Sequence, residues 1–421
     1  MIKLKKDLNS TFKKGDIMKI LHTSDWHLGK NLEGVSRIEE QEQFIEDFIH
    51  IVDENCIDLV IISGDIYDNS NPPARAEQLF YKALKKISSN GKRMVLIIAG
   101  NHDNPERLSA VTPLTYEQGV IILGKPKSYA EIGPCGDYSI VDSGEGYLEF
   151  KMNDEKAVVI TLPYPSEKRL NEILFKNIEE EERQKNYSDK IKHIFETLSQ
   201  KYRDDTINLL VSHLFVLGGE ETDSERPIQL GGSLAVSASV FPEKAQYIAL
   251  GHLHRPQEIK SKSRCIYAGS PLQYSKSEIG YTKCCYIVDV KAGKEPEVKS
   301  VPFKNYKPIE VWKCDGIENA IKKCEENTNR EVWVYLEIKT DRFISQEEIK
   351  EMKTLKKDIL EIRPIIIGED DYEDEFYDIK EKSMKELFKD FYTKQRMTEP
   401  SDEIMDLFLS IVQEEDEEDE A

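Results

Sequence analysis

Histidine, aspartate and asparagine side chains recur in five short motifs that could bind divalent metal ions. The motifs are SDWH, SGD, GNHD, SH and GHLH, and they hold five of the eight histidines of the chain. Imidazole and carboxylate ligands without thiolate favour manganese, iron or zinc over calcium. Any one motif alone would more often be an ordinary surface or structural feature, but together and in this order they predict a metal site. The residues in these motifs that could bind metal are Asp25, His27, Asp65, Asn101, His102, His213, His252 and His254.

Two metal ions held by such residues could hydrolyse a phosphodiester. A pair of divalent ions roughly 4 Å apart activates a water, neutralises the phosphate and stabilises the departing oxygen. Two ions facing two ligand aspartates leave a local charge of about +2, which attracts a phosphate. This matters because the net charge of −21 argues against a nucleic-acid partner. Seven of those charges lie in EEDEEDE at residues 414–420, which leaves −14 for the rest.

Each motif follows an apolar, β-branched run that predicts a strand, at residues 19–24, 59–63, 94–99, 208–212 and 247–250. Ligands bind at the carboxyl ends of strands in α/β sheets, so residues distant in sequence are expected to meet on one rim. Between the first two strands, Phe44, Phe48, Ile51 and Val52 recur at helical spacing and predict a helix that faces a sheet. The charged segment 167–202 predicts a helical excursion. The first 280 or so residues therefore indicate an α/β domain with stacked layers.

The remaining chain predicts smaller parts. Residues 303–371 indicate a compact α/β module in the order strand, helix, strand, helix, strand, with a capping box formed by Ser345 and Glu348. An acidic linker at 372–382 leads to a pair of short amphipathic helices at 383–413 and an acidic tail at 414–421. The pair carries Met384, Leu387, Phe388, Phe391, Ile404, Leu407, Phe408 and Ile411 at helical spacing. It predicts docking of a partner, or packing onto its own domain as the alternative.

Composition excludes several classes. The basic residues 1–17 predict a disordered extension and lack the apolar stretch of a secretory signal, and no apolar run approaches the roughly 18 residues of a membrane span. Seven scattered cysteines without a CxxC pair favour the cytoplasm. No GxxxxGKS/T motif occurs, so any dependence on ATP has to come from a partner.

The motif set resembles the calcineurin-like metallophosphoesterases, and the text around it resembles the SbcD family, the nuclease subunits of bacterial SbcCD complexes. The segments that carry this likeness are TSDWHLGKNLEGVSRIEEQEQF, SGDIYDNSNPPARAEQLFYKAL, IAGNHDNPERL, ERPIQLGG, IALGHLHRPQ and YAGSPLQYS. The likeness implies a layered β-sandwich metallophosphoesterase domain flanked by helices at 18–302. It further implies a DNA-capping α/β domain at 303–371 and docking of an SbcC-type ATPase by the helical pair.

The resemblance also implies roles for residues. One metal, most simply Mn²⁺, would be held by Asp25, His27, Asp65 and His254, and the other by Asp65, Asn101, His213 and His252. His102 would not bind metal but would contact the scissile phosphate and assist the leaving 3′ oxygen as general acid or charge stabiliser, with Asp103 fixing its orientation. The implied activities are an ATP-dependent double-strand exonuclease and a single-strand or hairpin endonuclease, in DNA repair, replication and recombination. A homodimer and DNA as ligand follow from the same likeness.

Two alternatives stay open at this stage. The same metal centre could act on nucleotides or phosphoproteins, because it fixes reaction type better than substrate. The chain could also be a noncatalytic scaffold that retains the fold, although such relics typically lose ligands and here every ligand position is filled.

Overall fold

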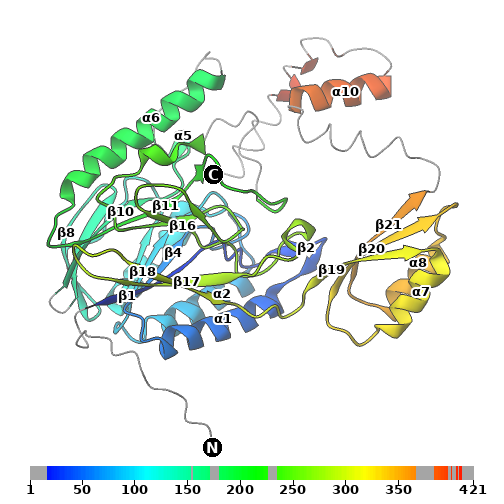
Figure 1. The fold of residues 1–421 in the computed structure, drawn as a ribbon, viewed down its shortest axis with the longest axis horizontal. Helices are drawn as coiled ribbons and strands as arrows, with labels where there is room; N and C mark the ends of the chain where they lie inside the picture. Colours follow the sequence, from blue (N-terminus) through cyan, green and yellow to red (C-terminus); the bar gives the residue numbers. More distant parts are fainter. Residues whose placement is uncertain are drawn as a thin grey trace, which may run out of the picture.

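Two β-sheets face each other in the computed structural model, which describes residues 17–152, 155–170, 180–225, 235–366, 384–396, 400, 404–405 and 407–409. Helices cover the outer surfaces of the sheets (Figure 1). The six-stranded sheet runs, edge to edge, β18 (Glu297–Pro302), β17 (Cys284–Val290), β1 (Met18–Thr23), β4 (Leu59–Ser63), β5 (Met94–Ile98) and β6 (Val120–Leu123). Strands β1, β4, β5 and β6 are parallel, and β17 and β18 pair antiparallel.

The second sheet has eight strands and is mixed in direction. Its order is β15 (Gln257–Ile259), β16 (Arg264–Tyr267), β14 (Tyr247–Gly251), β11 (Ile207–His213), β10 (Glu155–Leu162), β9 (Tyr147–Met152), β8 (Tyr138–Gly144) and β7 (Gly133–Cys135). The parallel strands β10, β11, β14 and β16 form its centre. Two-stranded pairs lie beside the sheets: β2 (Asn31–Leu32) with β3 (Val35–Ser36), and β12 (Phe215–Val216) with β13 (Ala235–Val236).

Three hydrophobic layers hold the sandwich together, and strand alternation assigns side chains to them. In β4, Leu59 and Ile61 point into the core between the sheets, whereas Val60 and Ile62 point to the helices. On that outer side lie α1 (Ile38–Glu54) and α2 (Ala74–Ile87), while α6 (Glu180–Leu198) covers the eight-stranded sheet. Shorter helices are α3 (Pro105–Ser109), α4 (Thr112–Thr115) and α5 (Glu167–Leu170). The expected layered α/β sandwich is therefore confirmed.

The five predicted strands all form, with ends that move by at most one residue at each terminus. The predicted helix is α1, in which Phe44, Phe48 and Val52 are buried and Ile51 is partly buried. The charged excursion is helical at α5 and α6, and residues 171–179 between them lie outside the described part of the chain.

A separate α/β unit, here called the C-terminal module (residues 309–366), follows the sandwich. It comprises β19 (Ile309–Asp315), α7 (Ile317–Glu326), β20 (Trp333–Thr340), α8 (Gln346–Leu355) and β21 (Ile359–Ile366), with a parallel sheet in the order β19, β20, β21. Its own core includes Val334, Leu336 and Ile338 against the helices. The capping box of Ser345 and Glu348 at the start of α8 is present as predicted.

Helix α10 (Met384–Arg396) corresponds to the first member of the predicted pair. Of the second member the structure describes residues 404–405 and 407–409, which are helical. The rings of Phe388 and Phe408 stack with centroids 3.9 Å apart, so the two segments contact each other. Residues 1–16 of the predicted extension at 1–17, the acidic linker and the acidic tail lie outside the described residues. Among the helices that are described, none combines the length and hydropathy needed to cross a membrane.

Candidate metal centre

All seven predicted ligands gather where the two sheets meet. Three loops come from the six-stranded sheet: Asp25 and His27 follow β1, Asp65 follows β4 and Asn101 follows β5. The eight-stranded sheet supplies His213 at the end of β11 and both His252 and His254 after β14. The predicted convergence at strand ends is present, and the rim is shared by two sheets.

The loops adopt conformations that non-glycine residues seldom take. Asp25, His27, Asp65 and His252 have φ of 53°, 46°, 51° and 107°. Such backbone costs of order 1–3 kcal/mol per residue and persists only where surrounding contacts fix it. Hydrogen bonds fix it here, from Asp25 N to Gly64 O and from His27 N to Asp65 O, both 3.0 Å. A Cβ atom on Gly100 would lie 2.1 Å from Asp65 Oδ1, so only glycine at this position lets the backbone of the GNHD loop lie this close to the Asp65 carboxylate.

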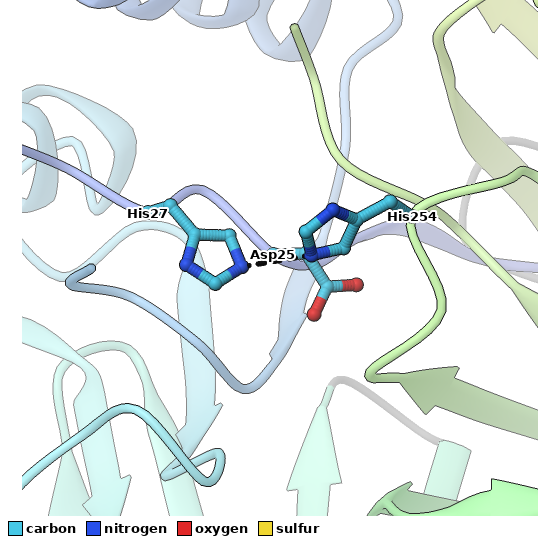
Figure 2. A group of neighbouring side chains, drawn as sticks. All are labelled: Asp25, His27 and His254. Atoms are coloured by element: carbon cyan, nitrogen blue, oxygen red, sulfur yellow. Dashed lines mark hydrogen bonds between the residues drawn. The ribbon is translucent and has the colours of Figure 1, made fainter. Parts of the chain in front are cut away.

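The first group of ligands consists of Asp25, His27 and His254 (Figure 2). All three side chains are buried, and the Nε2 atoms of His27 and His254 lie only 2.9 Å apart. The Asp25 carboxylate accepts hydrogen bonds from Ser24 Oγ at 2.6 Å and from the backbone N of His252 at 3.0 Å. Two imidazole nitrogens aimed at one point beside a carboxylate are a fitting donor set for a transition metal.

The second group is centred on Asn101, His213 and His252. The Oδ1 atom of Asn101 lies 2.9 Å from His213 Nε2 and 3.0 Å from His252 Nδ1. His213 donates from Nδ1 to the carbonyl of Ser63 at 2.9 Å, so Nε2 is the ring nitrogen that faces Asn101 and Asp65. Together with Asp65, the two histidines form the other end of the site.

Asp65 lies between the two groups and touches both. Its Oδ2 atom is 3.6 Å from His27 Nε2 and 3.4 Å from His213 Nε2. Its Oδ1 atom accepts a hydrogen bond from the backbone N of His102 at 2.9 Å. One oxygen is thus held by the protein, and the other faces both ligand groups, so Asp65 would be shared between two bound ions.

His102 lies at the mouth of this pocket and is 6% exposed. Its ring centroid is 4.6 Å from that of His27, and its Nδ1 donates to the carbonyl of Asp68 at 2.6 Å. Asp103 does not make this bond: its carboxylate accepts from the backbone N of Ile66, Tyr67 and Gly100 at 2.9–3.1 Å. Asp103 thus ties the SGD loop to the GNHD loop, which carries His102.

Other polar residues that sequence reasoning missed orient the ligands. Ser224 Oγ lies 2.5 Å from His254 Nδ1 and donates to Glu278, which also pairs with Lys283. Asp68 Oδ1 lies 3.5 Å from His27 Nδ1. Their spacing carries no motif, so only the folded chain reveals them.

Arg169 is a further residue that the sequence did not single out. Its guanidinium donates to the carbonyl of Gly100 at 2.6 Å and to the carbonyl of Asp103 at 2.7 Å. Those carbonyls lie on either side of Asn101 and His102 in the chain. Arg169 in α5 therefore stabilises the loop that carries both residues.

Burial and mutual charge set the protonation of the site. Burial lowers the pKa of His27 to about 4 and of His252 to about 3, so both rings are neutral and able to coordinate at neutral pH. Burial raises the pKa of Asp25 to about 6. Burial by itself would lower the pKa of His213, but the neighbouring Asp65 and Asp25 carboxylates outweigh this effect and raise the pKa to about 9. A pocket that concentrates carboxylates and imidazoles in this way is suited to a bound cation.

Comparison with known proteins identifies the family. Residues 18–256 match the family model of calcineurin-like phosphoesterases, and residues 305–396 match a model described as the type 5 capsule protein repressor C-terminal domain. The SbcD component of the nuclease SbcCD from Bacillus subtilis is 41% identical over 405 residues, covering 96% of this chain and 100% of that protein. The chain belongs to the SbcD family of calcineurin-like phosphoesterases.

Membership of the SbcD family confirms the resemblance predicted from the sequence, and the phosphoesterase domain implies divalent metal binding. Solved structures similar to the chain include a dimetal phosphatase from Danio rerio, with 13% identity and a TM-score of 0.34, and TT1561 of Thermus thermophilus, with 11% identity and a TM-score of 0.34. Each comparison covers 68% of this chain and 99% of the other.

Proposed function

We propose that this chain is the nuclease subunit of an SbcCD-type complex, a two-metal hydrolase that cuts DNA phosphodiester bonds. The observation that carries the proposal is the position of Asp65, whose Oδ2 faces a ligand group on either side. Two adjoining sets of N and O donors with one shared carboxylate suit two divalent ions side by side. The relative from Bacillus subtilis is described as part of a nuclease of this kind.

Asp25, His27, Asp65 and His254 would hold one ion, and Asp65, Asn101, His213 and His252 the other. The absence of thiolate among these donors supports Mn²⁺ as the simplest occupant. Bound there, the ions would supply an activated water and neutralise the phosphate. The protein holds the ligand geometry before any ion arrives, because hydrogen bonds fix the rings of His213 and His254 from their far sides.

His102 would act on the leaving group. Its Nδ1 donates to the Asp68 carbonyl, so Nε2 is the ring nitrogen that would face the scissile phosphate. That nitrogen could donate a proton or a hydrogen bond to the departing 3′ oxygen. Asp103 would support this step by fixing the loop backbone rather than the ring.

DNA is the substrate that fits both the relative and the architecture. The C-terminal module stands beside the catalytic domain and gives a second surface that an esterase for small molecules does not need (Figure 1). ATP dependence would come from an SbcC-type ATPase. All seven cysteines are free thiols, which fits a cytoplasmic complex.

The test is cleavage of end-labelled duplex and hairpin DNA, with and without the ATPase and ATP, by the wild type and by His102→Ala. We expect Mn²⁺-dependent cuts that His102→Ala reduces by about 100-fold or more, within the range for general acid catalysis. His50→Ala is the matched control, because His50 lies exposed on α1 away from the pocket. Equal cleavage by His102→Ala and the control would overturn the proposal.

The predicted pair of short helices at 383–413 is proposed as the ATPase-docking element. Its rings of Phe388 and Phe408 stack on each other, whereas Phe391 and Leu407 are 62% and 61% exposed, an apolar surface that suits a partner. Deleting residues 383–421 should abolish co-purification with an SbcC-type ATPase and leave Mn²⁺ binding intact. We also propose a homodimer, which light scattering of the purified chain would test by its mass.

A further inference from the structure

The C-terminal module touches the sandwich through one face of its sheet. Side chains alternate along β20, so Val334, Leu336 and Ile338 face the helices of the module. Trp333 and Tyr335 face the other way and form a small buried cluster with Leu32 of β2. Figure 1 shows the β2 hairpin beside β19 at this junction.

The side chain of Trp333 contacts a buried ion pair of the sandwich, formed by Arg37 and Glu40. Its indole N–H donates to Glu40 Oε1 at 2.9 Å. The same carboxylate accepts two hydrogen bonds of 2.6 Å from Arg37. Arg37 and Glu40 are 1% and 6% exposed, so each must satisfy its hydrogen bonds inside the protein. The C-terminal module therefore supplies, through the indole N–H of Trp333, one of the hydrogen bonds that the buried Glu40 carboxylate of the sandwich accepts.

Arg37 continues the chain of contacts toward the metal site. Its Nη1 donates to the carbonyl of Gln273 at 2.6 Å. The neighbouring Tyr274 donates through its hydroxyl to the carbonyl of Trp26 at 2.5 Å, and its ring centroid lies 5.6 Å from that of His27. The loop held by Arg37 thus packs directly against a metal ligand.

Gln41, next to Glu40, makes the second connection. Its side chain donates to the carbonyl of His27 at 2.7 Å and accepts from the backbone N of Gly29 at 2.9 Å. His27 has a φ of 46°, so its position depends on such contacts. Both branches reach the Asp25, His27 and His254 side of the centre, and neither reaches Asn101.

We infer that Trp333 is a positioning residue for the metal group around His27: by completing the Arg37–Glu40 pair, the C-terminal module fixes the loops that hold that ligand. The inference rests on the proposed two-metal function. It predicts that a change in the module's contact with Glu40 alters the affinity for the ion beside His27 and leaves the affinity for the ion beside Asn101 unchanged.

Trp333→Phe tests it, because phenylalanine keeps an apolar ring but has no N–H for Glu40. Trp312→Phe is the matched control: Trp312 lies in the core of the same module and donates to Glu310 at 2.7 Å, on the face away from the sandwich. Binding of Mn²⁺ to the metal-free chain is followed by electron paramagnetic resonance of the free ion, and hydrolysis of bis-p-nitrophenyl phosphate is measured in parallel.

We expect Trp333→Phe to weaken one of two Mn²⁺ sites by about 3- to 10-fold, less than the loss from a residue that touches a ligand directly. The other site and the KM for the small substrate should stay unchanged, and Trp312→Phe should match the wild type. Equal Mn²⁺ affinities in Trp333→Phe and the wild type, or equal weakening of both sites, would overturn the inference. A wild type that binds no Mn²⁺ pair would instead refute the proposed function.

Discussion

Replacing Arg169 by methionine should disable the catalytic loop without touching a metal ligand. The change removes two hydrogen bonds from a charged guanidinium, to the carbonyls of Gly100 and Asp103. Each is worth roughly 1.5–3 kcal/mol when fully lost. Arg169 is partly exposed, so water can replace part of the lost hydrogen bonding. We therefore take a loss of about 2–3 kcal/mol for the two hydrogen bonds together.

If that free energy holds the loop in its productive geometry, kcat/KM for bis-p-nitrophenyl phosphate should fall by roughly 30- to 100-fold, at about 1.4 kcal/mol per tenfold. The loss should appear mainly in kcat, because the loop carries His102. Mn²⁺ affinity should weaken at the ion beside Asn101 and stay unchanged at the ion beside Asp25. Steady-state kinetics and Mn²⁺ titration measure these effects separately.

Arg203→Met provides the control for lost stability. Arg203 binds Glu149 through two nitrogens at 2.7 and 3.0 Å, in the same domain but before the start of β11, whose opposite end carries His213. A general loss of stability would affect both variants alike. The reasoning is refuted if Arg169→Met keeps kcat/KM within threefold of the wild type, or if Arg203→Met loses as much.

Three further predictions follow from single contacts. Asp65→Asn should weaken both Mn²⁺ sites by at least about tenfold, because Oδ2 serves both groups; loss of only one ion in a titration would contradict a bridge. His213 has a pKa raised to about 9, so it stabilises the metal-free protein fully below pH 6.5 and loses this contribution as pH rises through 9. In urea unfolding with a chelator, the free energy of unfolding of the wild type should fall by up to about 2 kcal/mol between pH 7 and 8.5, and that of His213→Asn should fall by less. Parallel plots of stability against pH for the two proteins would contradict this role of His213. Ser345→Ala should cost about 1 kcal/mol at the start of α8, seen as faster amide exchange in the C-terminal module, and unchanged exchange would show the cap to be dispensable.

The sequence predicted that these residues come together because each candidate ligand sits at the end of a strongly patterned strand. Five apolar runs give the strands, and the polar residue after each is placed by the strand end itself, as with Asp65 after β4. Sheet membership was not predictable in this way, because periodicity shows that a strand is buried and not which sheet it joins. The loops of Asp25 and His213 belong to different sheets.

The supporting contacts were out of reach for a second reason. Arg169 acts on backbone carbonyls, so no partner residue type marks it in the sequence. Trp333 and Glu40 are separated by 293 residues, and nothing in either local pattern pairs them. Local patterns fix secondary structure and strand ends, whereas these contacts depend on the packing of distant segments.

Because the candidate ligands come from both sheets, two ions bound as proposed would act as a cross-link within the chain. His27 and His254 are 227 residues apart in the sequence. Tying such distant points restricts the unfolded chain by on the order of 5 kcal/mol in the loop-entropy description. The centre also cannot exist until residue 254 has been synthesised and the two sheets have closed on each other. A chain that ends before residue 254 would therefore lack the proposed centre, and cutting activity would arise only once both sheets have folded.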